Sequence, residues 1–126
     1  MTEDAAVGLI RALIENLRKA PEDWDSMAMI LGFDSVGVNR VTGFVYDADG
    51  AHTSVTASPY DIGPAAKAFT DSRYQPDQPL PVSMLVQFDR RGGEYEVTFE
   101  DTDPGRWKLT PESWDSLPLE LRPQFG

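Results

Sequence analysis

The sequence contains no cysteine and a single histidine, His52. Without a thiolate the chain cannot form disulfides, a thiolate zinc site or a cysteine nucleophile. No serine or cysteine motif surrounds His52, and no glycine-rich phosphate-binding motif occurs in the chain. We therefore expect no nucleophilic catalysis, no bound metal and no cofactor.

Basic residues are also scarce, since 11 lysines and arginines stand against 21 aspartates and glutamates and give a formal net charge of −10. An acidic surface repels nucleic acid and anionic membranes, and it speeds encounters with basic proteins. The composition therefore argues against a nucleic-acid or membrane partner and favours a basic protein.

Long, uniformly apolar stretches are missing, so neither a signal peptide nor a membrane span is predicted. The N-terminal segment is instead amphipathic, with apolar residues at the spacing of one helix face: Ala6, Leu9, Ile10, Leu13, Ile14 and Leu17. This spacing predicts a helix over residues 3–20, with Thr2 as its N-cap and Pro21 as its stop. We expect one domain, residues 1–126, in a soluble cytoplasmic protein.

Three segments downstream have the composition of β-strands. Residues 24–33 are a continuous apolar run, residues 38–47 are rich in β-branched and aromatic side chains, and residues 51–58 are a weaker strand. Turns at residues 34–35 and 47–50 separate them. This pattern predicts a three-stranded meander.

A short helix is predicted from Ser58-Pro59, and another of one or two turns opens at Thr110-Pro111, near Trp114. A hairpin lies between these two helices. The order α-β-β-β-α-β-β-α predicts an α+β fold with a largely antiparallel, five-stranded sheet. The N-terminal and middle helices are expected on its apolar face, with the other face partly open.

The hairpin, from Phe88 to Asp103, is the most informative segment of the chain. Apolar and polar residues alternate on both sides of a turn at residues 90–93. Three cross-strand pairs place the apolar side chains on one face: Phe88 with Tyr95, Val86 with Val97 and Met84 with Phe99. Carboxylates fall on the opposite face or directly after it: Glu94, Glu96, Glu100, Asp101 and Asp103. This arrangement indicates a surface for a basic partner.

The same carboxylates suggest an enzymatic alternative, because Glu94 and Glu96 lie two residues apart with Asp89 opposite them. A glycoside hydrolase needs one buried, protonated acid and a cleft that holds the sugar. An open acidic sheet face offers neither. We therefore expect the protein not to be an enzyme.

The turn at residues 47–50 suggests a calcium loop, because it contains Asp47, Asp49 and Gly50. In the EF-hand pattern, however, Val45 and Thr56 would then occupy the first and last ligand positions, and neither supplies a carboxylate. A hairpin turn is the better interpretation.

Trp107 permits two interpretations. It lies between Arg106 and Lys108, just beyond the acidic run. It could pack against the edge of the sheet, or it could be an aromatic anchor beside an acidic patch, as in many interface hot spots.

Taken in order, the Trp-led strand at 24–33, the late hairpin and the Asp103-Pro104-Gly105-Arg106-Trp107 segment resemble the YezG-like immunity proteins. These are small bacterial antitoxins that neutralise polymorphic or LXG-type toxins. The hairpin has the form F-D-R-x-G-x-Y/F-x-V/I followed by acidic residues, and the resemblance covers most of the chain as a layout. The chain departs from this layout in segment 59–81, where prolines and glycines replace a longer helical region.

The resemblance implies an immunity protein that binds a cognate toxin, many of which are nucleases with a basic active-site groove. The acidic surface would block that groove without chemistry. The implied partner-binding residues are Asp47, Asp49, Glu94, Glu96, Glu100, Asp101, Asp103 and Trp107. The alternative is a non-catalytic acidic adaptor, or a self-associating assembly domain, without a toxin partner.

Overall fold

The computed structural model describes residues 2–18, 20–34, 37–73, 81–103, 106–107, 110–113 and 115–123. In chain order its elements are α1 (Thr2–Asn16), β1 (Ser26–Phe33), β2 (Val38–Tyr46), β3 (His52–Thr56), α2 (Pro59–Arg73), β4 (Ser83–Asp89), β5 (Tyr95–Glu100) and α3 (Leu117–Leu121). This is the predicted α+β order. Among the described helices, none is long and apolar enough to cross a membrane.

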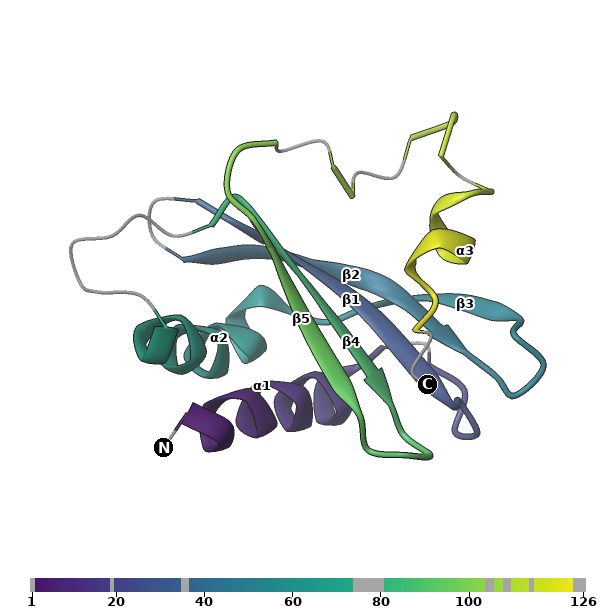
Figure 1. The fold of residues 1–126 in the computed structure, drawn as a ribbon, viewed down its shortest axis with the longest axis horizontal. Coiled ribbons are helices and arrows are strands. Elements are labelled where there is room, and N and C mark those ends of the chain that lie inside the picture. The colour runs from purple at the N-terminus through teal and green to yellow at the C-terminus, as the bar shows by residue number, and fades with distance from the viewer. Residues whose placement is uncertain are drawn as a thin grey trace.

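The strands form one antiparallel sheet in the order β3-β2-β1-β4-β5 (Figure 1). The run Ser26–Phe33, which is almost entirely buried, lies at the centre because β2 and β4 pair with it on its two sides. A strand with both faces covered needs apolar residues at consecutive positions, which explains why this segment lacks alternation. The sheet edges are β3 and β5.

Both long helices lie on one face of the sheet (Figure 1). The α1 stripe of Leu9, Ile10 and Leu13 packs with Ile62 and Phe69 of α2 over the sheet side chains below. Those sheet residues occupy alternate positions on four strands: Met27, Met29, Leu31, Val41, Val45, Val55, Met84 and Val86. This is the main core, and the sequence predicted both helices on this face.

The opposite face of the sheet is partly covered by the C-terminal segment, a packing that the sequence did not predict. A second core is formed by sheet residues together with the C-terminal segment: Ala28, Ile30, Phe44, Tyr46, Leu85, Trp107, Leu117 and Leu121. Two side chains tie the segment down, since the Tyr46 hydroxyl donates to the Pro118 carbonyl (2.5 Å) and Gln87 Nε2 donates to the Leu121 carbonyl (2.8 Å). Burial raises the pKa of the Tyr46 phenol well above its ordinary value, although the charge of Arg122 acts against this.

The register predicted for the hairpin is confirmed, because β4 and β5 pair Met84 with Phe99, Val86 with Val97 and Phe88 with Tyr95. The burial of its apolar face is graded, however. Met84 and Val86 are fully buried, whereas Val97 is half-buried and Tyr95 is 39% exposed. Val97 and Tyr95 are less buried because β5 is an edge strand, which has a neighbouring strand on its inner side only.

Several predicted helix boundaries were wrong. Helix α1 ends at Asn16, whose side-chain amide donates to the Ala12 carbonyl (2.8 Å), and the Arg18 N–H then donates to the Thr56 carbonyl at the β3 edge (2.8 Å). At the C-terminus, Thr110 and Ser113 bond reciprocally in a turn, and α3 begins only at Leu117. The predicted start of that helix at Thr110 was therefore wrong, and Trp114 itself lies outside the described residues.

Candidate protein-binding surface

The predicted carboxylates of the hairpin lie on the face of the sheet opposite the long helices. Val97 and Phe99 pack toward the helices, so the alternation of a strand directs Glu96 and Glu100 to the other side. Glu94 and Glu96 are exposed, and neither forms an ion pair with any residue that the structure describes. These two carboxylates are therefore available to a partner.

Glu100 differs from Glu94 and Glu96, because the fold uses its carboxylate. Its Oε2 accepts hydrogen bonds from the N–H groups of Asp103 (3.1 Å) and Thr102 (3.2 Å), and its Oε1 pairs with Arg106 (2.9 Å). The Asp103 N–H, then the Arg106 side chain and then Thr102 lower the pKa of Glu100 to about 2, although slight desolvation acts against them. The prediction that Glu100 lies on an open acidic face was wrong, since only 15% of its side chain is exposed.

The acidic residues near β5 thus fall into two groups along the strand. Glu96 and Glu100 are separated by four residues, or roughly 13 Å of strand. Asp101 and Asp103 continue from the Glu100 end, and both are exposed. The row of carboxylates is therefore not uniform, because Glu100 is engaged within the fold while the carboxylates on both sides of it are exposed.

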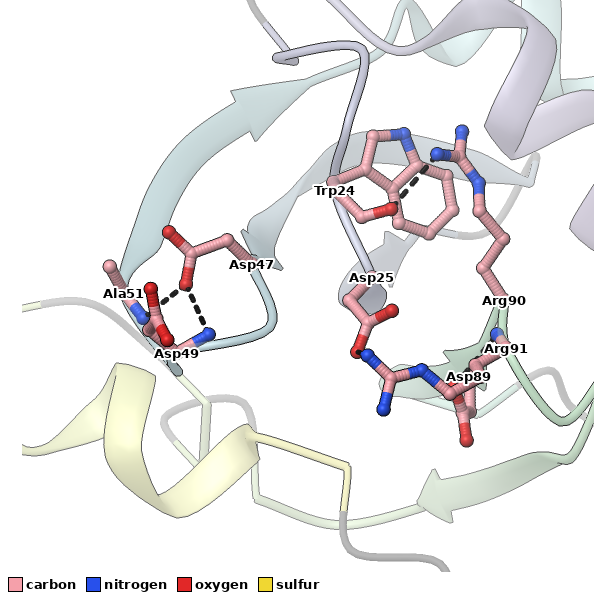
Figure 2. Close-up of polar contacts among 8 residues, drawn as sticks. All are labelled: Trp24, Asp25, Asp47, Asp49, Ala51, Asp89, Arg90 and Arg91. Atoms are coloured by element: carbon pink, nitrogen blue, oxygen red, sulfur yellow. Dashed lines mark hydrogen bonds and ion pairs between the residues drawn. The ribbon is translucent and has the colours of Figure 1, made fainter.

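Asp47 and Asp49 lie in the β2–β3 turn, at the same end of the sheet as the hairpin turn, since Ser26 pairs with both Tyr46 and Asp89. Asp47 Oδ1 accepts hydrogen bonds from the N–H groups of Asp49 and Ala51, both at 2.9 Å (Figure 2). Asp47 therefore holds the turn, as the sequence predicted for this segment. Asp49 is exposed.

Two arginines of the hairpin turn hold the segment that leads into β1 (Figure 2). The Arg90 guanidinium lies 3.8 Å from the centroid of the Trp24 ring, and its Nη1 donates to the carbonyls of Trp24 (2.9 Å) and Glu22 (3.0 Å). Arg91 pairs with Asp25 at 3.2 Å. The positive charge of this turn is therefore engaged within the molecule and does not pair with Glu94 or Glu96.

The sequence analysis gave no role to Arg90 and Arg91. Two adjacent arginines inside an acidic hairpin indicate that they pair with other groups of the molecule. The segment that Arg90 contacts, however, lies more than 60 residues earlier in the chain. No local pattern indicates which residues that segment contributes.

Trp107 is only 7% exposed and belongs to the second core, next to Leu117. Arg106 lies over its ring, 4.7 Å from the centroid. This burial fits the packing interpretation of Trp107. The anchor interpretation would require the C-terminal segment to move away from the sheet.

The described residues do not contain a group of three or more histidines, aspartates and glutamates placed to hold a metal ion. His52 is exposed on β3, where its ring meets Phe44 edge-on at 5.6 Å. Glu94 and Glu96 are exposed, whereas the glycosidase alternative needs a buried acid. What this surface offers is exposed negative charge.

No model of a known protein family matches the chain, and a search of curated proteins also returned no match.

Proposed function

We propose that this protein is an immunity protein that binds and neutralises a cognate bacterial toxin, a basic nuclease domain, in the cytoplasm. The exposed pair Glu94 and Glu96 carries this proposal. Glu96 lies on an edge strand and Glu94 directly before it, in a chain with a net charge of −10. The layout shared with YezG-like immunity proteins gives the class of partner.

The mechanism is binding and not chemistry. A nuclease groove is basic because it must hold phosphates, so carboxylates on a rigid strand can occupy the same positive field. Opposite charges accelerate the encounter, and the contacts made after docking determine how slowly the complex dissociates. The hairpin suits this role because Arg90 and Arg91 fix its turn against residues 22–25.

The experiment compares two charge reversals that change the net charge equally. Glu94→Lys with Glu96→Lys alters the hairpin surface, and Glu112→Lys with Glu120→Lys alters exposed positions of the C-terminal segment. An immunity gene is expected next to the gene of its toxin, so the cognate toxin domain is sought there. We expect the hairpin variant to bind that domain roughly 100-fold more weakly, and the control to change little. Glu100 is not used, because its substitution would also break local structure.

Protection of nuclease activity distinguishes the immunity function from a non-catalytic acidic adaptor. The wild-type protein should abolish toxin activity at a one-to-one ratio. A protein that binds other partners but leaves the toxin active would favour the adaptor and end the immunity proposal.

A further inference from the structure

The outer edge of β5 is the one part of the described sheet where exposed backbone, apolar surface and negative charge come together. Strand β5 pairs with β4 on its inner side only. The Asp89 N–H donates to the Glu94 carbonyl, and bonding direction alternates along an antiparallel pair. The N–H and C=O groups of Tyr95 and Val97 therefore point away from β4, at the edge.

An apolar groove lies on the helix side at the Tyr95 end of this edge. It has a volume of about 310 Å³ and is lined by α1 residues Val7, Ile10, Arg11 and Ile14 and by Phe88, Gly93 and Tyr95 of the hairpin. Two of these side chains are large and exposed, since Val7 is 43% and Tyr95 is 39% exposed. Every second side chain of a strand placed beside β5 would face the helix side, and those near Tyr95 would lie over this groove.

The intervening side chains of such a strand would meet the other face, where Glu94 and Glu96 are exposed. Basic side chains fit there. Arg11 stands on the groove side and disfavours a second basic residue on that face. The two faces together therefore select a strand in which basic and apolar residues alternate.

We propose that the partner binds as an extended segment of alternating basic and apolar residues, which adds a sixth strand to the outer edge of β5. Its apolar side chains cover the α1 groove, and its lysines or arginines meet Glu94 and Glu96. This inference rests on the proposed function for the source of the segment, a basic toxin. A second copy of the chain is a poor occupant, because antiparallel pairing of two β5 strands around Val97 puts no basic side chain opposite Glu94 or Glu96.

The opposite edge of the sheet supplies a matched control. Strand β3 also has outward N–H groups, at His52, Ser54 and Thr56, because the Asp47 N–H donates to the Ala51 carbonyl. Its outward Thr56 carbonyl already accepts the Arg18 N–H, and the exposed residues around Ser54 are polar. The β3 edge thus has the backbone groups, and it also borders a cavity of about 410 Å³ lined by residues such as Phe44, Trp107 and Leu117. Residues His52–Thr56 contain no carboxylate, and this absence distinguishes the β3 edge from β5.

The test uses a six-residue peptide of alternating lysine and valine, matched to the length of β5. It is titrated into the wild-type protein and into Val97→Pro, Val97→Ala and Ser54→Pro variants. Proline removes an outward N–H without touching the bonds to β4, and alanine removes the Val97 side chain but keeps its N–H. We expect Val97→Pro to bind at least about tenfold more weakly than Val97→Ala, with Ser54→Pro unchanged.

Amide exchange of the wild-type protein gives a second measurement, in case Val97→Pro does not fold. The bound peptide should slow exchange at the Tyr95 and Val97 amides and leave Ser54 unchanged. A peptide with three lysines followed by three valines should bind more weakly than the alternating one. Equal binding by the two peptides, equal binding by the two Val97 variants, undetectable binding or no protection at β5 would each overturn the proposal.

Failure of this inference and failure of the proposed function remain distinguishable. If the toxin domain does not bind the wild-type protein, the proposed immunity function is wrong. A toxin that binds Val97→Pro and Val97→Ala equally well removes only the edge-strand mode.

Discussion

Near each end of the β4–β5 hairpin an arginine lies over a tryptophan ring. The two arginines differ in whether they pair with a neighbouring carboxylate. Arg106 lies over Trp107 and pairs with Glu100 at 2.9 Å. Arg90 lies over Trp24 and donates to two backbone carbonyls. The first arrangement neutralises a β5 carboxylate, and the second leaves Glu94 and Glu96 exposed.

A carboxylate therefore adds to the net charge of the chain whether or not it is exposed to a partner. Glu96 and Glu100 lie on the same strand and the same face, yet one is exposed while the other accepts three hydrogen bonds through Oε2. A charged group that already has good partners gains little from another. The interface should therefore use exposed carboxylates such as Glu94 and Glu96 and not Glu100.

The largest effect is expected at Trp107, the tryptophan that Arg106 covers. Replacing it with alanine empties part of the second core, so Trp107→Ala should lower the free energy of unfolding by about 3–5 kcal/mol, as measured by urea denaturation. Trp107→Phe should cost less. An alanine variant with wild-type stability and weakened toxin binding would instead restore the anchor interpretation.

A smaller effect is expected at Arg90, which lies in the hairpin turn and covers Trp24. Arg90→Ala removes the contact with Trp24 and both carbonyl bonds and should cost roughly 1–3 kcal/mol of unfolding free energy. Arg91→Ala is the matched control. It breaks only a largely exposed ion pair with Asp25, which is worth less than about 1 kcal/mol. Equal costs at Arg90 and Arg91 would show that the stacked arginine does not hold the turn.

The smallest effect is expected at Glu100, and it should appear as a dependence on pH. The folded protein lowers the pKa of Glu100 from 4.5 to about 2, so its stabilising contribution is complete above the unfolded value and is lost as the pH falls toward 2. Glu100→Gln should therefore be less stable than the wild-type protein above pH 5, and the two should converge near pH 2. Glu96→Gln is the control, and it should leave the stability unchanged within about 0.5 kcal/mol. A constant difference between the Glu100→Gln variant and wild type across this range would contradict the assigned role.

The sequence predicted those parts of the fold that local patterns encode. Alternation around the turn at residues 90–93 fixed the register of the hairpin, because a slip of one residue would expose its apolar side chains. The helical spacing of Leu9, Ile10 and Leu13 likewise gave the buried face of α1.

The sequence did not predict the contacts between distant segments. Leu117 and Leu121 look like ordinary apolar residues of a short helix, and only the folded sheet shows that Tyr46 and Gln87 bind the α3 backbone. The same limit applies to the candidate site. Its acidic residues were visible in the sequence, but the engagement of Glu100 and the outward backbone of Val97 depend on the tertiary structure.

Binding kinetics with the cognate toxin domain show whether Glu94 and Glu96 form the interface. Three proteins are compared at low and high salt: wild type, Glu94→Lys with Glu96→Lys, and Glu112→Lys with Glu120→Lys. We predict that only the hairpin reversal slows association and weakens affinity, by roughly 100-fold. The difference from wild type should shrink at high salt, because salt screens the charges. Equal affinity of the hairpin variant and its control would contradict the account and place the interface elsewhere on the protein.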